Sequence, residues 1–463
     1  MKTNKLLFLL QSLSEKEQKA FAGWLKGPCH NKRQDVLRLY SLIKRKDEQA
    51  MTKEELFGLI YPERSYSDVM MRQLIHLLQK ALQQFLVFEQ LLRNEQQMEL
   101  ELTRIYRQRK LDGLFHKHLR AVRRKRQQSP LRNNNYYQLQ YQLHLEEFAA
   151  ISENRRSIPV NLQEMGEALE INFIVSKLLH SCHALSHQNV YKTEYQPGLL
   201  DKILEYIEEQ QLLKIPIIQL YYHCYKALSA SNNNSHFTQL KQLLITTKAQ
   251  LEAKEIRELY LLALNHCIRA INQGSQKYLR EAFELYRLGI AQDFLINDGK
   301  LTPFTYRNAI TAGLNLKEFD WVYQFIHDYK DALDIQFREN NFQYCLAKYY
   351  YEQKIFEQAS PLLHNLKFED TISNLAVRTL QLKIYFENGD YDLLEALLGS
   401  FKAFVRRHKL ISYHKENYLN IIQLTQRLVT TNLFDREKKK GLKAEIEALQ
   451  PLTERDWLLE QLR

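Results

Sequence analysis

The feature that most constrains the fold is a residue pair that recurs five times in the C-terminal half of the chain. Each pair places an aromatic residue or a leucine three positions before an apolar or small residue. The first members lie 42, 40, 37 and 35 residues apart, which is about the length of one helical hairpin. The spacing therefore predicts a series of stacked helical hairpins. The pairs are Phe237/Leu240, Leu279/Ala282, Phe319/Val322, Phe356/Ala359 and Tyr391/Leu394.

A predicted turn precedes each pair. Asn and Gly recur in these turns, and both accept the left-handed backbone that ends a helix. We therefore expect each hairpin to close just before its pair. The predicted turns are Asn232–Asn234, Gln273–Ser275, Asn315–Lys317, Gln353–Lys354 and Asn388–Asp390.

The composition favours an all-α fold. Only 13 Gly and 9 Pro occur in 463 residues, whereas Leu, Gln, Glu, Lys and Arg, which favour helices, are abundant. A chain of this length exceeds what one hydrophobic core usually organises, so the repeated pairs indicate an array. We expect an all-α protein in which residues 133–463 form a helical-hairpin α-solenoid and residues 1–132 form a compact helical domain before it.

The charge is concentrated in the first of these domains. Residues 1–132 hold 27 Lys and Arg against 14 Asp and Glu, whereas the rest of the chain holds 38 and 40. The formal charge of +11 therefore belongs to the N-terminal domain. Ser129-Pro130 and Asn133–Asn135 predict a loop or hinge at the boundary. Whether the basic domain packs against the array or swings on this hinge stays open.

Two stretches resemble tetratricopeptide repeats, which implies that hairpins stack along residues 200–400. In that family small or aromatic residues stand where the helices of one hairpin, and of adjacent hairpins, meet. Val322 and Leu394 depart from the pattern, because the family usually has alanine there. The whole chain also looks like a group of uncharacterised bacterial cytoplasmic helical-repeat proteins, a likeness that implies no activity. The positions that carry the repeat resemblance are Leu346, Ala347, Tyr350, Phe356, Ala359 and Leu363, then Leu382, Tyr385, Gly389, Tyr391 and Leu398.

Residues 52–82 are similar to the core of winged-helix DNA-binding domains of bacterial transcriptional activators. A capped helix that starts at Thr52 leads through Tyr61-Pro62 into a helix that would read the major groove. Residues 87–110 depart from that family, because they predict helix where a two-stranded wing should follow. The alternative is a solvated helix face. The residues that the resemblance aims at DNA are Arg72, His76, Gln79, Lys80 and Gln83.

The most basic surface is predicted on a helix that follows Asp112-Gly113. Its apolar residues are spaced by four and three positions, which places Lys117, Arg120 and Arg124 on the opposite face. These cations are suited to nucleic-acid phosphates or to an acidic partner protein, and a solvated face explains them equally.

Signatures of catalysis are missing from the sequence. It has no phosphate-binding loop, dinucleotide-binding fingerprint, nucleophile elbow or zinc-protease motif, so we expect no enzymatic activity and no cofactor. His183 and His187 lie one helical turn apart beside Cys182, but no third ligand follows, and we expect no metal. The five scattered cysteines, a short N-terminal apolar run and the lack of a long apolar segment predict a cytoplasmic protein without membrane contact.

The leading function that follows is a non-enzymatic cytoplasmic scaffold or adaptor that binds a protein or peptide. Tyrosine is enriched in binding hot spots, and three consecutive tyrosines on a helix are not expected to face the core together. The alternative is a transcriptional regulator that binds nucleic acid through residues 1–132 and uses the array as a sensor. The partner's identity and the oligomeric state stay open. The tyrosines predicted to line a groove are Tyr222, Tyr225, Tyr349, Tyr350 and Tyr351.

Overall fold

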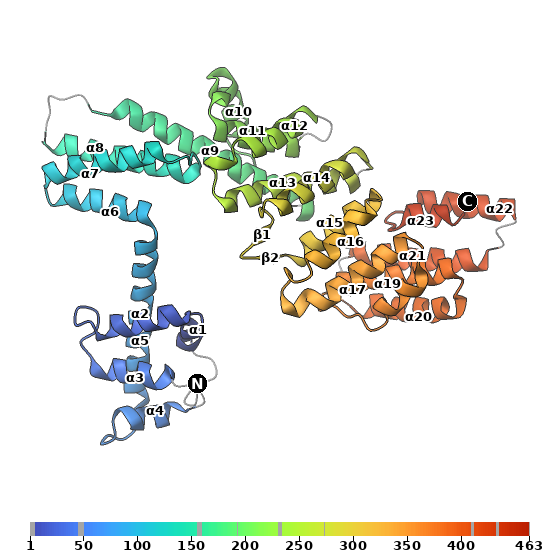
Figure 1. Ribbon diagram of the computed structural model, residues 1–463, viewed down its shortest axis with the longest axis horizontal. Coiled ribbons are helices and arrows are strands. Elements are labelled where there is room, and N and C mark those ends of the chain that lie inside the picture. Colours follow the sequence, from blue (N-terminus) through green and yellow to red (C-terminus); the bar gives the residue numbers. More distant parts are fainter. Residues whose placement is uncertain are drawn as a thin grey trace. The chain divides into compact units, whose positions relative to one another are not determined.

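The computed structural model confirms the all-α class (Figure 1). It describes residues 5–44, 51–154, 160–191, 193–229, 234–272, 274–408, 412–431 and 435–462. No helix in these ranges is long and apolar enough to cross a membrane. By their internal contacts the residues form two units, Met1–Pro130 with Asn134–Asn172, and Leu131–Asn133 with Phe173–Arg463. The chain passes between the units on either side of residues 131–133, where the sequence placed a boundary at residue 132, and again after Asn172, inside α9.

The first part of unit 1 is a helical cluster around one long helix, α5. Four shorter helices pack on α5 and bury side chains such as Phe21, Leu39 and Leu78. Both predicted capping boxes are present, with Ser14 and Thr52 as the caps of α2 and α4. The helices are α1 (Lys5–Gln11), α2 (Glu15–Lys26), α3 (Gln34–Lys44), α4 (Lys53–Ile60) and α5 (Asp68–Arg93).

The second part of unit 1 holds α6 (Glu95–Gln108), α7 (Asp112–Gln128), α8 (Asn134–Asn154) and the start of α9 (Leu162–Tyr191). The predicted apolar stripe of α7 packs against α6 and α8 in a shared core. The sequence predicted a loop or hinge at Ser129-Pro130 and Asn133–Asn135, and the loop that is present is short, because α8 begins at Asn134. Asn133 is buried, and its amide donates to Glu255 Oε2 at 2.8 Å.

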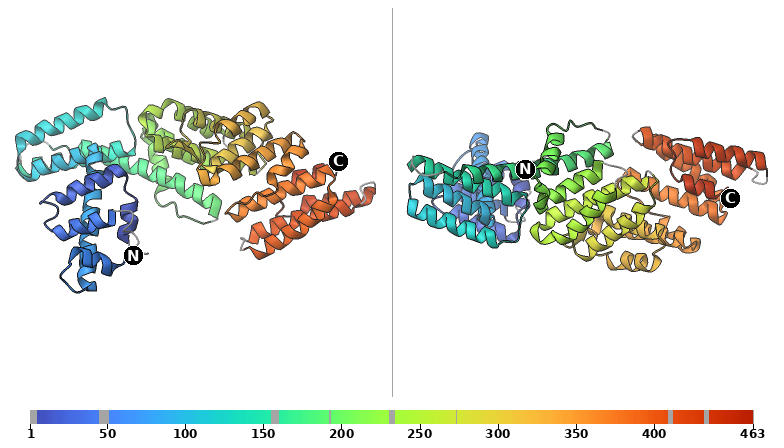
Figure 2. Two further views of the ribbon diagram at one scale, coloured as in Figure 1. Left: turned by 60° about the horizontal axis from the view of Figure 1, so that its bottom comes forward. Right: turned by 90° about the horizontal axis from the view of Figure 1, so that it is seen from above.

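Unit 2 continues from α9 in a run of helices that Figure 2 shows from two further sides. A two-stranded antiparallel ribbon, in which Ile296 pairs with Leu301, interrupts the run after α14. Asp298 and Gly299 both have positive φ angles at the ribbon's turn. The elements are α10 (Leu200–Glu209), η2 (Leu212–Lys214), α11 (Pro216–Ser229), α12 (Asn234–Thr246), η3 (Lys248–Gln250), α13 (Ala253–Asn272), α14 (Lys277–Ala291), β1 (Ile296–Asn297), β2 (Lys300–Leu301), α15 (Pro303–Asn315), α16 (Phe319–Asp328), α17 (Ile335–Glu352), α18 (Phe356–Leu363), α19 (Thr371–Asn388), α20 (Tyr391–Arg407), α21 (Ser412–Thr430), α22 (Arg436–Ala448) and α23 (Arg455–Glu460).

Helices α11 to α20 pack as five consecutive pairs, from α11 with α12 to α19 with α20. The second helix of each pair also packs on the first helix of the next pair. First helices contact each other directly in α11 with α13, α15 with α17, and α17 with α19. The turns predicted at 315–317, 353–354 and 388–390 lie where these pairs close, whereas residues 232, 233 and 273 of the other two turns lie outside the described residues.

The recurring residue pairs mark where the helices meet. All five second members, Leu240, Ala282, Val322, Ala359 and Leu394, are at most 1% exposed. The first members become less buried along the chain, from Phe237 in the core to Tyr391, which is 52% exposed. The departure at Val322 has a local explanation, because a Cβ atom added to Gly313 on α15 would stand only 2.5 Å from Val322 Cγ2. The missing side chain of Gly313 thus leaves space for Val322, whereas an alanine at position 322 would need less space.

Candidate interaction surfaces

The proposed DNA-reading residues share the solvent face of α5. Arg72, His76, Lys80 and Gln83 are exposed and Gln79 is partly buried. The opposite face of α5 packs in the core of the cluster. No strand follows in the described part of unit 1, since α5 runs to Arg93 and α6 begins at Glu95. The winged-helix resemblance therefore does not extend to a wing.

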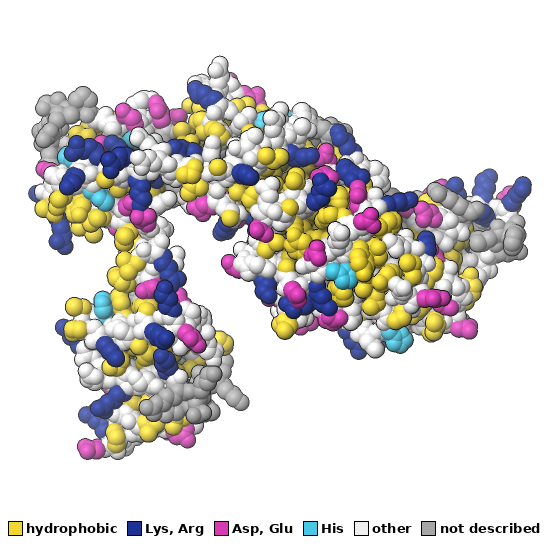
Figure 3. Space-filling model, viewed as in Figure 1, with side chains coloured by type: hydrophobic (Ala, Val, Ile, Leu, Met, Phe, Trp, Pro, Cys, Tyr) yellow, Lys and Arg dark blue, Asp and Glu magenta, His cyan; other side chains and the backbone are white. Residues whose placement is uncertain are grey.

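The basic helix α7 presents three free cations. Lys117, Arg120 and Arg124 are exposed, and no carboxylate of the described residues lies within ion-pair distance of them. Figure 3 shows Lys and Arg side chains gathered over this part of unit 1.

Other cations of α6 and α7 make contacts that stabilise the fold. Arg104 and Arg107 both donate to the buried carboxylate of Glu146, at 2.9 and 2.8 Å. The guanidinium of Arg126 lies 4.5 Å from the ring centre of Tyr136. The structure thus separates cations that hold α6 to α8 together from those that face solvent.

Three of the five tyrosines that the sequence predicted to line a groove are buried. Tyr222, Tyr349 and Tyr351 are buried, and Tyr225 and Tyr350 are partly buried. Tyr351 donates its hydroxyl to Glu387 on α19, and Tyr349 packs beside Tyr323 on α16 at 5.4 Å between ring centres.

The physical reason is that α17 has neighbours on several sides, including α15, α16, α18 and α19. A helix within such a layer has more than one buried face. Consecutive tyrosines can therefore both be buried, each against a different neighbour.

The histidine pair on α9 lies on the exposed side of the helix. His183 and His187 are both exposed, whereas Cys182 is buried. The Cys182 thiol donates to the carbonyl oxygen of Tyr221 at 3.7 Å. No group of three His, Cys, Asp or Glu side chains able to hold a metal ion occurs in the described ranges.

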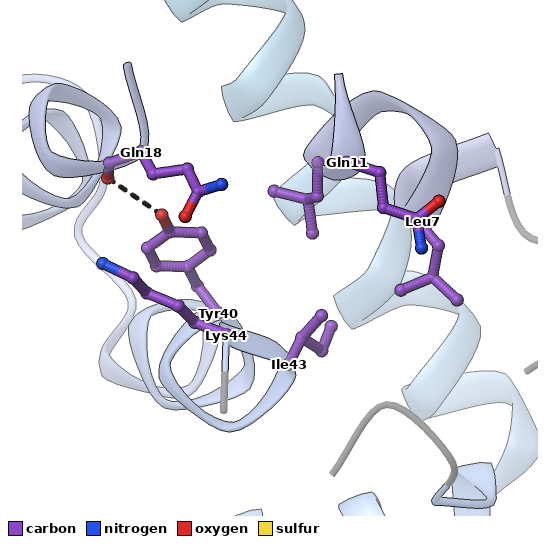
Figure 4. A pocket seen from close by; sticks show the side chains of 7 residues that line it. Leu7, Gln11, Gln18, Tyr40, Ile43 and Lys44 are labelled. Atoms are coloured by element: carbon purple, nitrogen blue, oxygen red, sulfur yellow. Dashed lines mark hydrogen bonds between the residues drawn. The ribbon is translucent and has the colours of Figure 1, made fainter. Parts of the chain in front are cut away.

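A pocket of about 250 Å³ lies between α1, α2 and α3 of unit 1 (Figure 4). The Tyr40 hydroxyl on its wall donates to the backbone carbonyl of Gln18 at 2.9 Å. Tyr40 and Lys44 are the titratable side chains among the described residues that line it. Its lining residues are Leu7, Leu10, Gln11, Gln18, Tyr40, Ile43 and Lys44.

The sequence reasoning missed a row of cations on unit 2, which we call the cation row. It consists of Arg307 on α15, Lys348 on α17 and Lys383 on α19, all partly buried. The Arg307 guanidinium donates to Ser373 Oγ at 2.6 Å, and the Lys348 ammonium donates to Thr311 Oγ1 at 3.0 Å. These bonds connect α15 to both α17 and α19.

Residues 450–462, here called the C-terminal segment, lie against the same helices. Glu454 forms an ion pair with Lys383 at 2.8 Å. The indole N–H of Trp457 donates to Glu387 Oε1 at 2.8 Å, and its ring packs against Phe386 at 5.5 Å between ring centres. The segment thus contacts α19 through a carboxylate and, three residues later, an indole.

Only one position of the cation row is neutralised by a close carboxylate. In the described residues, no Asp or Glu lies within ion-pair distance of Arg307 or Lys348. Burial lowers the pKa of Lys348; the charge of Glu454 opposes this effect, Lys383 adds to it, and Glu352 opposes it more weakly. The environment of Lys348 therefore favours an additional negative charge.

A hollow of about 1090 Å³ adjoins the C-terminal segment. One wall is the segment itself, including Glu454 and Trp457, and the other consists of the ends of α13 and α15 and the start of α14. This hollow is open and mostly polar, and it lies within unit 2. Its lining residues are Ile271, Gly274, Gln276, Asn315, Gln450, Pro451, Leu452, Glu454, Arg455, Asp456 and Trp457.

The repeat register contains a pattern that could have located the cation row. Thr311, Lys348 and Lys383 each stand eight residues before the first member of a recurring pair, at Phe319, Phe356 and Tyr391. Equivalent positions of stacked repeats share one face. Reading this single position along the chain would have placed two lysines side by side.

Comparison with family models, with curated proteins and with solved structures finds no match to this chain.

Proposed function

We propose that this chain is a non-enzymatic cytoplasmic scaffold, built on tetratricopeptide-like helical hairpins of an α-solenoid, that binds a segment of another protein. The observation that carries the proposal is the contact of the C-terminal segment with α19. A stretch outside the five helix pairs is held there by an ion pair to Lys383 and an indole bond to Glu387.

The packing order supports this proposal. In a repeat array each pair contacts only its neighbours, so equivalent side chains of successive first helices line one continuous surface. Lys348 and Lys383 occupy one such equivalent position on α17 and α19. A surface built in this way suits an extended ligand, because contacts recur at each repeat.

The test is capture of partners from gently lysed cells with the full chain and with a Lys348→Gln/Lys383→Gln variant. We expect proteins that bind the wild type to be lost from the variant and retained by Lys367→Gln/Lys440→Gln, which removes two exposed lysines elsewhere. Circular dichroism checks that all three proteins are folded. Identical captured sets for the wild type and the first variant would contradict the proposal.

The free cations of α7 favour a second candidate function, binding of nucleic acid by unit 1. Lys117, Arg120 and Arg124 have no close carboxylate in the described residues and would displace counterions from phosphates. We expect mobility-shift binding of duplex DNA or RNA that weakens with salt. Since each lost phosphate contact lowers the salt slope by about 0.9, changing all three residues to Gln should lower it by about 2 to 3. Absence of binding at low salt removes this candidate.

A further inference from the structure

We propose that the cation row is a docking site for an acidic segment of a partner protein, and that Glu454 fills only one of its three positions. Arg307 and Lys348 are the positions left for the partner's carboxylates. The inference rests on the proposed scaffold function and adds the chemistry of the ligand.

The charges of the cation row are the first argument for an acidic ligand. Three cations come from three different helices, and among the described residues the only carboxylate in an ion pair with them belongs to the C-terminal segment. Partly buried cations without a close anion are unfavourable, so an arriving carboxylate gains more here than at an exposed lysine. Glu387 on α19 is already engaged, because it accepts hydrogen bonds from Tyr351, Lys354 and Trp457.

The second argument is Glu454, because its contact with Lys383 shows how the cation row binds a carboxylate. Its side chain reaches Lys383 from a residue with a positive φ angle of 54°, at the N-terminus of α23. The same carboxylate influences Lys348, Tyr344 and Tyr351 through space. A carboxylate is therefore accommodated among groups from α17 and α19.

Phe304 adds an apolar element beside the cations. It is 68% exposed on α15, and the guanidinium of Arg307 lies 5.2 Å from its ring centre and 5.5 Å from that of Phe368. Figure 3 shows further apolar side chains gathered on unit 2. An acidic segment that also carries a leucine or an aromatic residue would cover Phe304, which favours such a peptide over a phosphate backbone.

The charge of Glu454 also sets the affinity of the site for acidic ligands. While it neutralises Lys383, an acidic ligand meets two free cations and one nearby negative charge. Replacing Glu454 by Gln would remove that charge and open the third position. Affinity for acidic peptides should therefore rise in this variant, unlike the effect of changing Glu460, which is exposed on the same short helix.

The experiment uses the full chain and a fluorescent peptide, Gly-Glu-Glu-Leu-Glu-Glu-Gly, with a Gln-for-Glu version as the uncharged probe. Fluorescence anisotropy at low salt should show binding of the acidic peptide only. We expect Arg307→Gln/Lys348→Gln to weaken it about tenfold and Glu454→Gln to strengthen it at least about threefold, with Glu460→Gln unchanged. Glutamine at 307 and 348 retains a donor for Ser373 and Thr311, and circular dichroism reports folding.

A second variant excludes binding at the basic surface of unit 1. Lys117→Gln/Arg120→Gln/Arg124→Gln should bind the acidic peptide as the wild type does. Carbodiimide coupling of the peptide to the wild-type chain, mapped by mass spectrometry, should label Lys348 or Lys383 and not Lys367. This mapping remains decisive if the double variant does not fold.

Equal binding by the wild type and Arg307→Gln/Lys348→Gln, coupling confined to other lysines, or tighter face-dependent binding of single-stranded DNA would each overturn the proposal. If cellular partners still depend on Lys348 and Lys383 while the acidic peptide does not bind, the scaffold function stands and the acidic ligand is refuted.

Discussion

The buried His266 makes the stability of unit 2 depend on pH. Its ring is 2% exposed between Phe237 and Tyr278, at 5.2 and 5.0 Å between ring centres. Neither ring nitrogen has a hydrogen-bond partner among the residues that the structure describes. Burial, followed by the charge of Arg269, lowers the pKa of His266 to about 4, from 6.5. Replacing His266 by Phe removes this titration.

The magnitude follows from the two pKa values. Between 6.5 and about 4 the unfolded chain binds the proton and the folded chain does not, so stability falls as the pH falls through this window. Lowering the pH from about 7.5 to about 5 costs roughly 2 kcal/mol through this residue alone. For a unit of this size that corresponds to a loss of about 4 °C in Tm.

The assay is thermal melting of the wild type and His266→Phe at both pH values, followed by circular dichroism at 222 nm. Other groups also titrate, including His223, whose pKa burial lowers to about 4, so the informative quantity is the difference between the two proteins in their pH-induced loss of Tm. Any packing cost of the larger ring cancels in this difference. The same change at exposed His364 reports the effect of losing a surface imidazole. If His266→Phe loses as much Tm as the wild type, the reasoning is refuted.

Three further predictions concern stability and are read from urea or thermal unfolding. Gly313→Ala should cost about 2 kcal/mol, because its Cβ would stand 2.5 Å from a buried methyl group, whereas Gly399→Ala, with open space around it, should gain about 0.5 kcal/mol; equal effects would contradict the packing argument. Glu146→Gln should cost about 3 kcal/mol by leaving two arginines without their shared carboxylate, against less than about 1 kcal/mol for the more exposed Glu101→Gln, and a reversed order would refute this. Tyr351→Phe should cost about 1 to 2 kcal/mol by removing a buried hydroxyl bond, and an unchanged midpoint would show that this bond contributes nothing.

Local patterns predicted much of the helical structure. Ser14 and Thr52 cap their helices as the sequence indicates, because a capping box depends on residues only three apart. The recurring pairs located the helix contacts of unit 2. A small or apolar residue at a fixed offset from the turn of each hairpin packs at the equivalent helix contact in every repeat. All five second members are buried.

Local patterns could not predict contacts between residues that are far apart in the sequence. Lys383 and Glu454 are 71 positions apart, and nothing near either one indicates the other. The buried tyrosines of α17 were assigned to a groove because periodicity describes one apolar face, whereas a helix within a layer has several. The free cations of α7 could be predicted as a solvent face, but the pairing of Arg104 and Arg107 with Glu146 depends on how α8 packs.

The ribbon of β1 and β2 has a consequence for how unit 2 responds to load. It separates α13 from α15, and these two first helices make no contact comparable to that of α15 with α17. Helix α14 packs on both α13 and α15, so mechanical and thermal coupling across this point passes chiefly through α14. The helices from α11 to α14 and those from α15 onward should melt as two cooperative blocks, and a ligand seated on α15 to α19 should protect only the second block from opening.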